Sequence, residues 1–193
     1  MINTLFITFI RSGTHTIWQH RKISEDNHIA LYRNWRLGGL WSEKKIMYYI
    51  DNLEGECTGH VPYSDNVYNH LKRNGIRTVF VWRDLRDVVA SRFKSIEAGA
   101  AISIPTMNGD DIRDQDDMLP DIIREVANLW GRFSPWLDKA DAVYRYEELR
   151  GAALLLGNEN ELGWFQTGAV GSWKHLFKPQ HEQLVERLFT WEK

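Results

Sequence analysis

The sequence predicts an α/β fold in which a central parallel sheet is flanked by helices. Short runs of β-branched and aromatic residues alternate along the chain with amphipathic helical patterns. The run at 76–82, IRTVFVW, is almost wholly apolar, as a parallel strand covered on both faces should be. Ligands of such sheets bind at the carboxyl ends of the strands. We therefore expect one shared site at the strand–helix junctions 10–16, 82–85 and 145–148.

The amino-terminal half is predicted to form two strands and three helices. In chain order these are strand 4–10, helix 14–22, a helix within 41–53, helix 67–75 and strand 76–82. Ser42 is a suitable N-cap for the second helix, and Gly75 a suitable C-terminal cap for the third.

The carboxyl-terminal half continues the alternation. We expect helix 84–99 with Asp84 as N-cap, an acidic loop at 99–117, helix 119–133 with Pro120 in its first turn, a strand running into a helix over 141–149, and helix 178–189 with Pro179 near its start. Within the loop, the acidic run 109–117 has two interpretations. It either acts as a lid that selects a basic acceptor or, more commonly for such runs, forms a solvated surface.

Length and composition narrow the class of protein. The chain has 193 residues and is 43% hydrophobic, which predicts a single domain over 1–193. Its net charge of -2 gives no basic field for nucleic acid, and no stretch is long and apolar enough to span a membrane. Cys57 is the one cysteine, so we expect a reducing, cytoplasmic location. Histidines and acids lack metal-ligand spacing, so no metal is expected, and nothing predicts an oligomeric state.

The first strand–helix junction has the composition of an anion-binding loop. Gly13 allows the backbone to approach a ligand closely, and the amide groups and dipole of the following helix favour an anion. A Walker A loop would carry a lysine after its second glycine, and none is present here. The alternative is an ordinary turn with N-cap residues. For His15 we expect contact with the phosphate through its backbone N–H, the alternatives being a side chain that donates to a phosphate oxygen or one that points to solvent. The candidate ligands are Arg11, Ser12, Gly13, Thr14, His15 and Thr16.

The second junction adds another pair of anion ligands. Arg83 ends the apolar strand, and Ser91 follows eight positions later, about two helical turns on. Together the two side chains have the chemistry to bind a second phosphate. The alternative is a salt bridge from Arg83 to Asp84 or Asp87, with Ser91 an ordinary helical residue.

At these positions the chain resembles the sulfotransferase family, whose donor is 3′-phosphoadenosine 5′-phosphosulfate (PAPS). The family's P-K-S-G-T-T-W loop is similar to IRSGTHT, with Arg11 in place of lysine, and its 3′-phosphate ligands correspond to Arg83 and Ser91. GHVP places His60 at the family's catalytic base, and YRYEEL places Tyr146 near the adenine. The fifth match is QTGAVGSWKHLF at 166–177, which resembles R-K-G-x-x-G-D-W-K-x-x-F.

This resemblance implies a P-loop NTPase-like, three-layer fold and a reaction. A sulfuryl group would pass from PAPS to a hydroxyl or amine of a small-molecule or carbohydrate acceptor, leaving adenosine 3′,5′-bisphosphate (PAP), without a metal. His60 would act as base, a task suited to a histidine of near-neutral pKa, and Arg11 would stabilise the leaving oxygen. Gln166, Thr167 and Gly168 would lie at the nucleotide.

Several residues depart from the family pattern. Gln166 and Thr167 replace a basic pair, Ser172 replaces an aspartate, and Thr58 stands where many members have a lysine. Thr16 occupies the place of an adenine-stacking tryptophan, for which Trp18 is a candidate replacement. The segment 147–165 is shorter than in most members. Two alternatives therefore stay open: a small-molecule kinase of the P-loop kind, and a nucleotide-binding module without catalysis.

Overall fold

The computed structural model describes residues 2–29, 42–97, 115–149 and 170–189. The chain divides into two compact units, each described here by itself. The first unit comprises Met1–Arg83 and Gly131–Arg150, and the second comprises Asp84–Trp130 and Gly151–Lys193. Whether the two work as the single domain expected over 1–193 stays a prediction.

The first unit contains a five-stranded parallel sheet, which confirms the predicted α/β class. Its spatial order is β2-β3-β1-β4-β5. The strands are β1 (Ile2–Thr8), β2 (His28–Ile29), β3 (Gly55–Gly59), β4 (Arg77–Trp82) and β5 (Ala142–Arg145). All four pairings are parallel, so the carboxyl ends of the strands meet at one edge.

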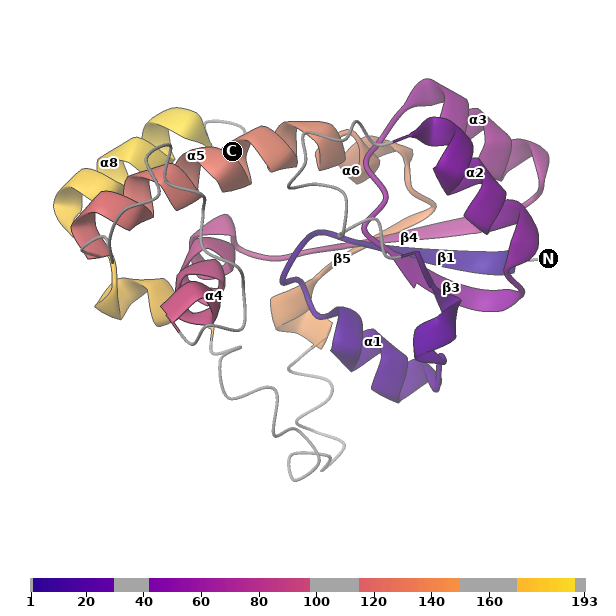
Figure 1. Cartoon of the computed structure of the whole chain (residues 1–193), viewed down its shortest axis with the longest axis horizontal. Coiled ribbons are helices and arrows are strands. Elements are labelled where there is room, and N and C mark those ends of the chain that lie inside the picture. The colour runs from indigo at the N-terminus through magenta and orange to yellow at the C-terminus, as the bar shows by residue number, and fades with distance from the viewer. Residues whose placement is uncertain (1, 30–41, 98–114, 150–169, 190–193) are drawn as a thin grey trace. The chain divides into compact units, whose positions relative to one another are not determined.

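Helices cover both faces of this sheet (Figure 1). Helix α1 (Thr14–Arg21) lies on one face, where Ile17 packs with Val79 and Val81 of β4. Helices α2 (Glu43–Asn52) and α3 (Asp65–Arg73) cover the other face, with η1 (Glu25–Asn27) and α6 (Trp136–Lys139) completing the unit. Burying each such aliphatic side chain contributes roughly 1.5–3 kcal/mol.

The predicted caps of α2 and α3 are confirmed. The Ser42 hydroxyl accepts a hydrogen bond from the Lys45 amide, as an N-cap does. Gly75 follows α3 in the left-handed conformation, with φ of 65°. Its amide donates to the Lys72 carbonyl at 3.1 Å, and the next amide reaches back to Leu71 at 3.0 Å. This pair of bonds is the Schellman ending that favours glycine.

Strands β2 and β3 were not predicted, and β1 begins and ends two residues earlier than the predicted strand 4–10. The sequence of β3, GECTG, has two glycines and little apolar character, so it lacks a strand pattern. Packing explains the second glycine. A Cβ atom on Gly59 would lie 2.9 Å from the Ile29 Cβ on the neighbouring strand, so only glycine fits.

The second unit is helical, with α4 (Leu85–Glu97), most of α5 (Gln115–Phe133), η5 (Ser172–His175) and α8 (Pro179–Leu188). Helix α8 begins at Pro179, as predicted. The expectation for Pro120 was wrong, because α5 begins at Gln115 and encloses this proline. Acidic residues after Gln115 favour an earlier helix start through the dipole. Residues 115–117 are therefore helical, and the rest of the loop expected at 99–117 lies outside the described residues.

Across the ranges that the structure describes, no helix is long and apolar enough to cross a membrane.

Candidate functional site

The loop between β1 and α1, residues 9–13, has the backbone shape of an anion site. Arg11 has φ of 59° and Gly13 has φ of 88°, whereas Ser12 between them does not have a positive φ. Left-handed and right-handed residues in succession turn their amide groups toward one concave side, which binds anions. The left-handed conformation costs Arg11 about 1–2 kcal/mol, because its Cβ crowds the following carbonyl. Such strain is typical of functional loops.

The hydroxyl groups of this loop are turned inward. Ser12 is fully buried, its amide donates to the Phe9 carbonyl at 3.1 Å, and its hydroxyl donates to the Ile10 carbonyl at 3.4 Å. The Thr14 hydroxyl lies 2.9 Å from that of Thr8. Ser12 therefore shapes the loop with its polar groups. The Thr16 side chain lies outside what the structure describes.

His60 follows β3 and lies beside this loop. Its Nδ1 is 2.8 Å from the Thr8 carbonyl and 3.2 Å from the Thr8 hydroxyl. A carbonyl only accepts, so Nδ1 carries the proton and Nε2 carries the lone pair of the neutral ring. Thr8, which the sequence did not single out, thereby sets the tautomer that a base needs.

The pKa of His60 is not the near-neutral value expected from the sequence. Burial of the ring, only 8% exposed, lowers this pKa from 6.5 to about 4, and the nearby charge of Arg11 adds to the effect. The ring is therefore neutral throughout the physiological pH range. It is a weaker base than an exposed histidine, but it is always in the form that accepts a proton.

A second histidine lies next to His60. His28, on β2, has its ring centroid 5.4 Å from that of His60. Its Nδ1 is 2.9 Å from the Thr58 hydroxyl, and burial followed by the proximity of His60 lowers its pKa to about 4. The sequence could not indicate His28, because a two-residue strand has no recognisable pattern.

Trp18, on α1, packs between two histidines. Its ring lies edge to face against His15 at 4.6 Å and His28 at 5.2 Å, and its indole N–H donates to Thr58 at 2.6 Å. The His15 side chain is exposed. Trp18 thus packs against His28, the histidine next to His60, and whether it also stacks on adenine stays a prediction.

The ends of β1, β4 and β5 meet as the sequence predicted. Arg83, directly after β4, is 2% exposed, and its Nη1 donates to the Arg11 carbonyl at 3.4 Å. Its guanidinium carbon lies 4.8 Å from the ring centroid of Tyr146, which follows β5 and is 2% exposed. The structure therefore brings together Arg11, Thr14, His60, Arg83 and Tyr146 within the first unit.

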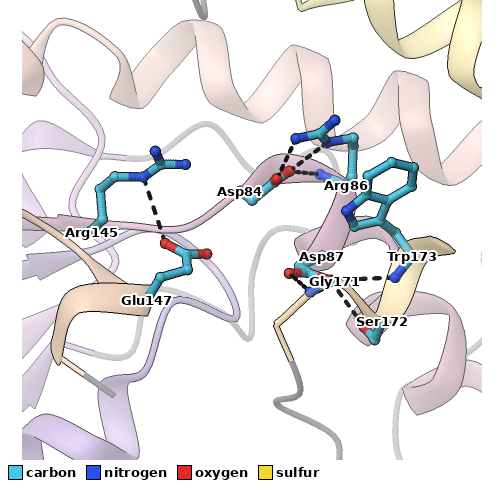
Figure 2. Close-up of polar contacts among 8 residues, drawn as sticks. All are labelled: Asp84, Arg86, Asp87, Arg145, Glu147, Gly171, Ser172 and Trp173. Atoms are coloured by element: carbon cyan, nitrogen blue, oxygen red, sulfur yellow. Dashed lines mark hydrogen bonds and ion pairs between the residues drawn. The ribbon is translucent and has the colours of Figure 1, made fainter. Parts of the chain in front are cut away.

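In the second unit, Asp87 organises the start of η5 (Figure 2). Its carboxylate, in a residue only 1% exposed, accepts from the Gly171 amide at 2.7 Å, the Ser172 hydroxyl at 3.1 Å and the Trp173 amide at 3.3 Å. Ser172, which stands where the sulfotransferase pattern has an aspartate, thus donates a hydrogen bond to Asp87. This carboxylate therefore holds the start of η5 to α4.

Three predictions concerning the second unit have different outcomes. Asp84 is confirmed as the N-cap of α4, since its carboxylate accepts from the Arg86 amide at 2.9 Å. Ser91 lies on α4 and is 6% exposed, and its role as a phosphate ligand stays a prediction. Gln166, Thr167 and Gly168 lie outside the described residues.

No cluster of three or more histidine, cysteine, aspartate or glutamate side chains is arranged to hold a metal ion in the described part of the chain.

Among the comparisons with known proteins, only the comparison with solved structures gives a match. No protein-family model and no curated protein sequence matches this chain. The crystal structure of mouse sulfotransferase SULT7A1 complexed with PAP matches with a TM-score of 0.58 and 14% identity, over 97% of this chain and 83% of that one. Shikimate kinase from Bacteroides thetaiotaomicron matches with a TM-score of 0.44 and 16% identity, over 83% and 99%. The first similarity shows a shared fold.

Proposed function

We propose that this chain is a PAPS-dependent sulfotransferase that modifies a hydroxyl or amine of a small-molecule or carbohydrate acceptor. One observation supports this more than any other. The anion-binding loop with left-handed Arg11 and Gly13 lies beside a neutral histidine, His60, whose Nε2 has the lone pair of a base. The fold shared with a sulfotransferase crystallised with PAP agrees with it.

The chain's own residues supply each requirement of the reaction. The loop amides and Arg11 hold the 5′-phosphosulfate and stabilise the negative charge that develops on the bridging oxygen as its bond to sulfur breaks. His60 Nε2 accepts the acceptor's proton while the acceptor oxygen or nitrogen forms the new bond to sulfur. The sulfuryl group is thereby transferred, and PAP leaves with the bridging oxygen.

The remaining site residues keep the roles that the family resemblance implies. Arg83 and Ser91 would bind the 3′-phosphate, and Tyr146 would lie near the adenine. Further contacts to the nucleotide are assigned on the same basis to Ser12, Thr14, His15, Thr16, Gln166, Thr167 and Gly168.

A transfer assay with isotopically labelled PAPS against a panel of acceptors tests this proposal. His60→Ala should reduce turnover by about 10²–10⁴-fold, because the general base is lost, while PAP affinity stays close to wild type. A matched control is His70→Ala, since His70 lies on α3 over the other face of the sheet. Full activity in His60→Ala would refute the assignment of the base.

The same assay separates the two alternatives. Turnover of ATP that depends on magnesium, without sulfuryl transfer, would indicate a P-loop kinase. Tight PAP binding without transfer to any acceptor would indicate a nucleotide-binding module.

A further inference from the structure

Arg83 has a structural partner in the β1–α1 loop. Its side chain lies at the end of β4 and is almost fully buried, at 2% exposure. The Nη1–H group donates to the backbone carbonyl of Arg11 at 3.4 Å. A guanidinium group is a permanent charge, and in a buried setting its hydrogen bonds are strengthened by the low local dielectric. Arg83 therefore links the end of one strand to the loop that follows another.

Tyr146 fixes the same guanidinium from the end of a third strand. The guanidinium carbon lies 4.8 Å from the Tyr146 ring centroid, and the tyrosine is itself 2% exposed. A cation–π contact of this kind is stronger when it is shielded from water. Strands β1, β4 and β5 are neighbours in the sheet. The Arg83 side chain, at the end of β4, therefore contacts residues that follow both β1 and β5.

Arg83 contacts the backbone carbonyl of the loop's left-handed residue. Arg11 is left-handed, a conformation that a residue with a Cβ keeps only where its surroundings hold it. The Arg11 carbonyl and the Ser12 amide belong to one peptide plane. Arg83 binds the carbonyl of that plane, and the Phe9 carbonyl accepts from its amide at 3.1 Å. Both ends of the plane are thus fixed before Gly13 and the first turn of α1.

We propose that Arg83 is a positioning residue for the β1–α1 loop, in addition to any contact with a 3′-phosphate. It holds the Arg11–Ser12 peptide in the orientation that directs the following amides at an anion. The identity of that anion, the 5′-phosphate end of an adenine nucleotide, rests on the proposed function. Binding of a 5′-phosphate should therefore depend on Arg83, although Arg83 need not touch it.

Two nucleotides distinguish this role from a contact with the 3′-phosphate. AMP has the 5′-phosphate only, whereas PAP has both. Titration calorimetry on the full chain should show that Arg83→Met lowers the affinity for AMP by about tenfold or more, and the affinity for PAP by at least as much. A loss of PAP affinity with unchanged AMP affinity would overturn the proposal.

A matched control and a second variant distinguish a specific loss of binding from a loss of folding. Arg21→Met removes another arginine that lies over an aromatic ring, that of Phe6 at 5.9 Å, at the carboxyl end of α1, and should leave both affinities unchanged. Arg83→Lys keeps the charge but lacks the planar fork, so it should also weaken AMP binding. If Arg83→Lys folds and binds AMP as the wild type does, the proposal is wrong.

Hydrogen exchange without any ligand tests the loop directly. The amides of residues 9–14 should exchange faster in Arg83→Met than in wild type, and the same amides should be unaffected in Arg21→Met. Unchanged exchange in Arg83→Met would overturn the positioning role. If the wild type binds neither AMP nor PAP, the proposed function fails, whereas the exchange rates still decide the role of Arg83.

Discussion

Acidification should destabilise this protein through His60. The pKa of this buried ring is lowered from 6.5 to about 4, so the unfolded chain binds a proton at a higher pH than the folded chain does. Stability therefore falls as the pH drops from about 6.5 toward 4, because the unfolded state binds more protons in that interval. For this one histidine the loss is about 2 kcal/mol by about pH 5 and about 3 kcal/mol once the folded ring is also protonated. His28, whose pKa is lowered in the same way, adds to the effect.

Urea unfolding at a series of pH values measures this loss. The wild type and His60→Gln should differ in slope, because the variant lacks the titrating ring. Between about pH 7.5 and pH 5 the variant should lose about 2 kcal/mol less than wild type does. His70→Gln, at a half-buried position of α3 outside the site, controls for the replacement of a histidine as such. Parallel curves for wild type and His60→Gln would refute the reasoning.

Two pairs of substitutions test the packing around Gly59 and around Asp87. Gly59→Ala should lower the free energy of unfolding, measured in urea, by about 1–3 kcal/mol, because the new Cβ would lie 2.9 Å from the Ile29 Cβ. The control Gly131→Ala, with open space around it in α5, should be neutral or stabilising by up to about 1 kcal/mol. Equal effects of the two changes would contradict the close packing of β2 on β3. Asp87→Ala should lower the free energy of unfolding by about 2–4 kcal/mol, since three donors at the start of η5 lose their acceptor, and Ser172→Ala by only about 1 kcal/mol. A loss for Asp87→Ala no larger than that for Ser172→Ala would show that the carboxylate does not organise this turn.

The elements with strong patterns were predictable from the sequence. β4 is apolar along most of its length, and α2 and α8 have clear starting signals at Ser42 and Pro179. β3 could not be predicted, because its glycine is required by contact with Ile29 rather than by strand propensity. The start of α5 was missed because Pro120 is usually a first-turn residue.

The candidate site also has parts that the sequence predicts and parts that it does not. Its strand ends were predictable, because parallel topology brings Arg11, Arg83 and Tyr146 to one edge. Thr8 was missed because it lies inside a strand, where its hydroxyl carries no signal of the contact with His60. The low pKa of His60 was also out of reach, since it depends on burial by residues distant in sequence.

Titration calorimetry of PAP in a chelating buffer tests the central claim most directly. We expect PAP to bind without a divalent metal and more tightly than AMP does. Arg11→Ala should weaken PAP binding at least tenfold, through loss of a charged ligand of the phosphate. Absence of any PAP binding by the wild type, together with magnesium-dependent binding of ATP, would contradict it.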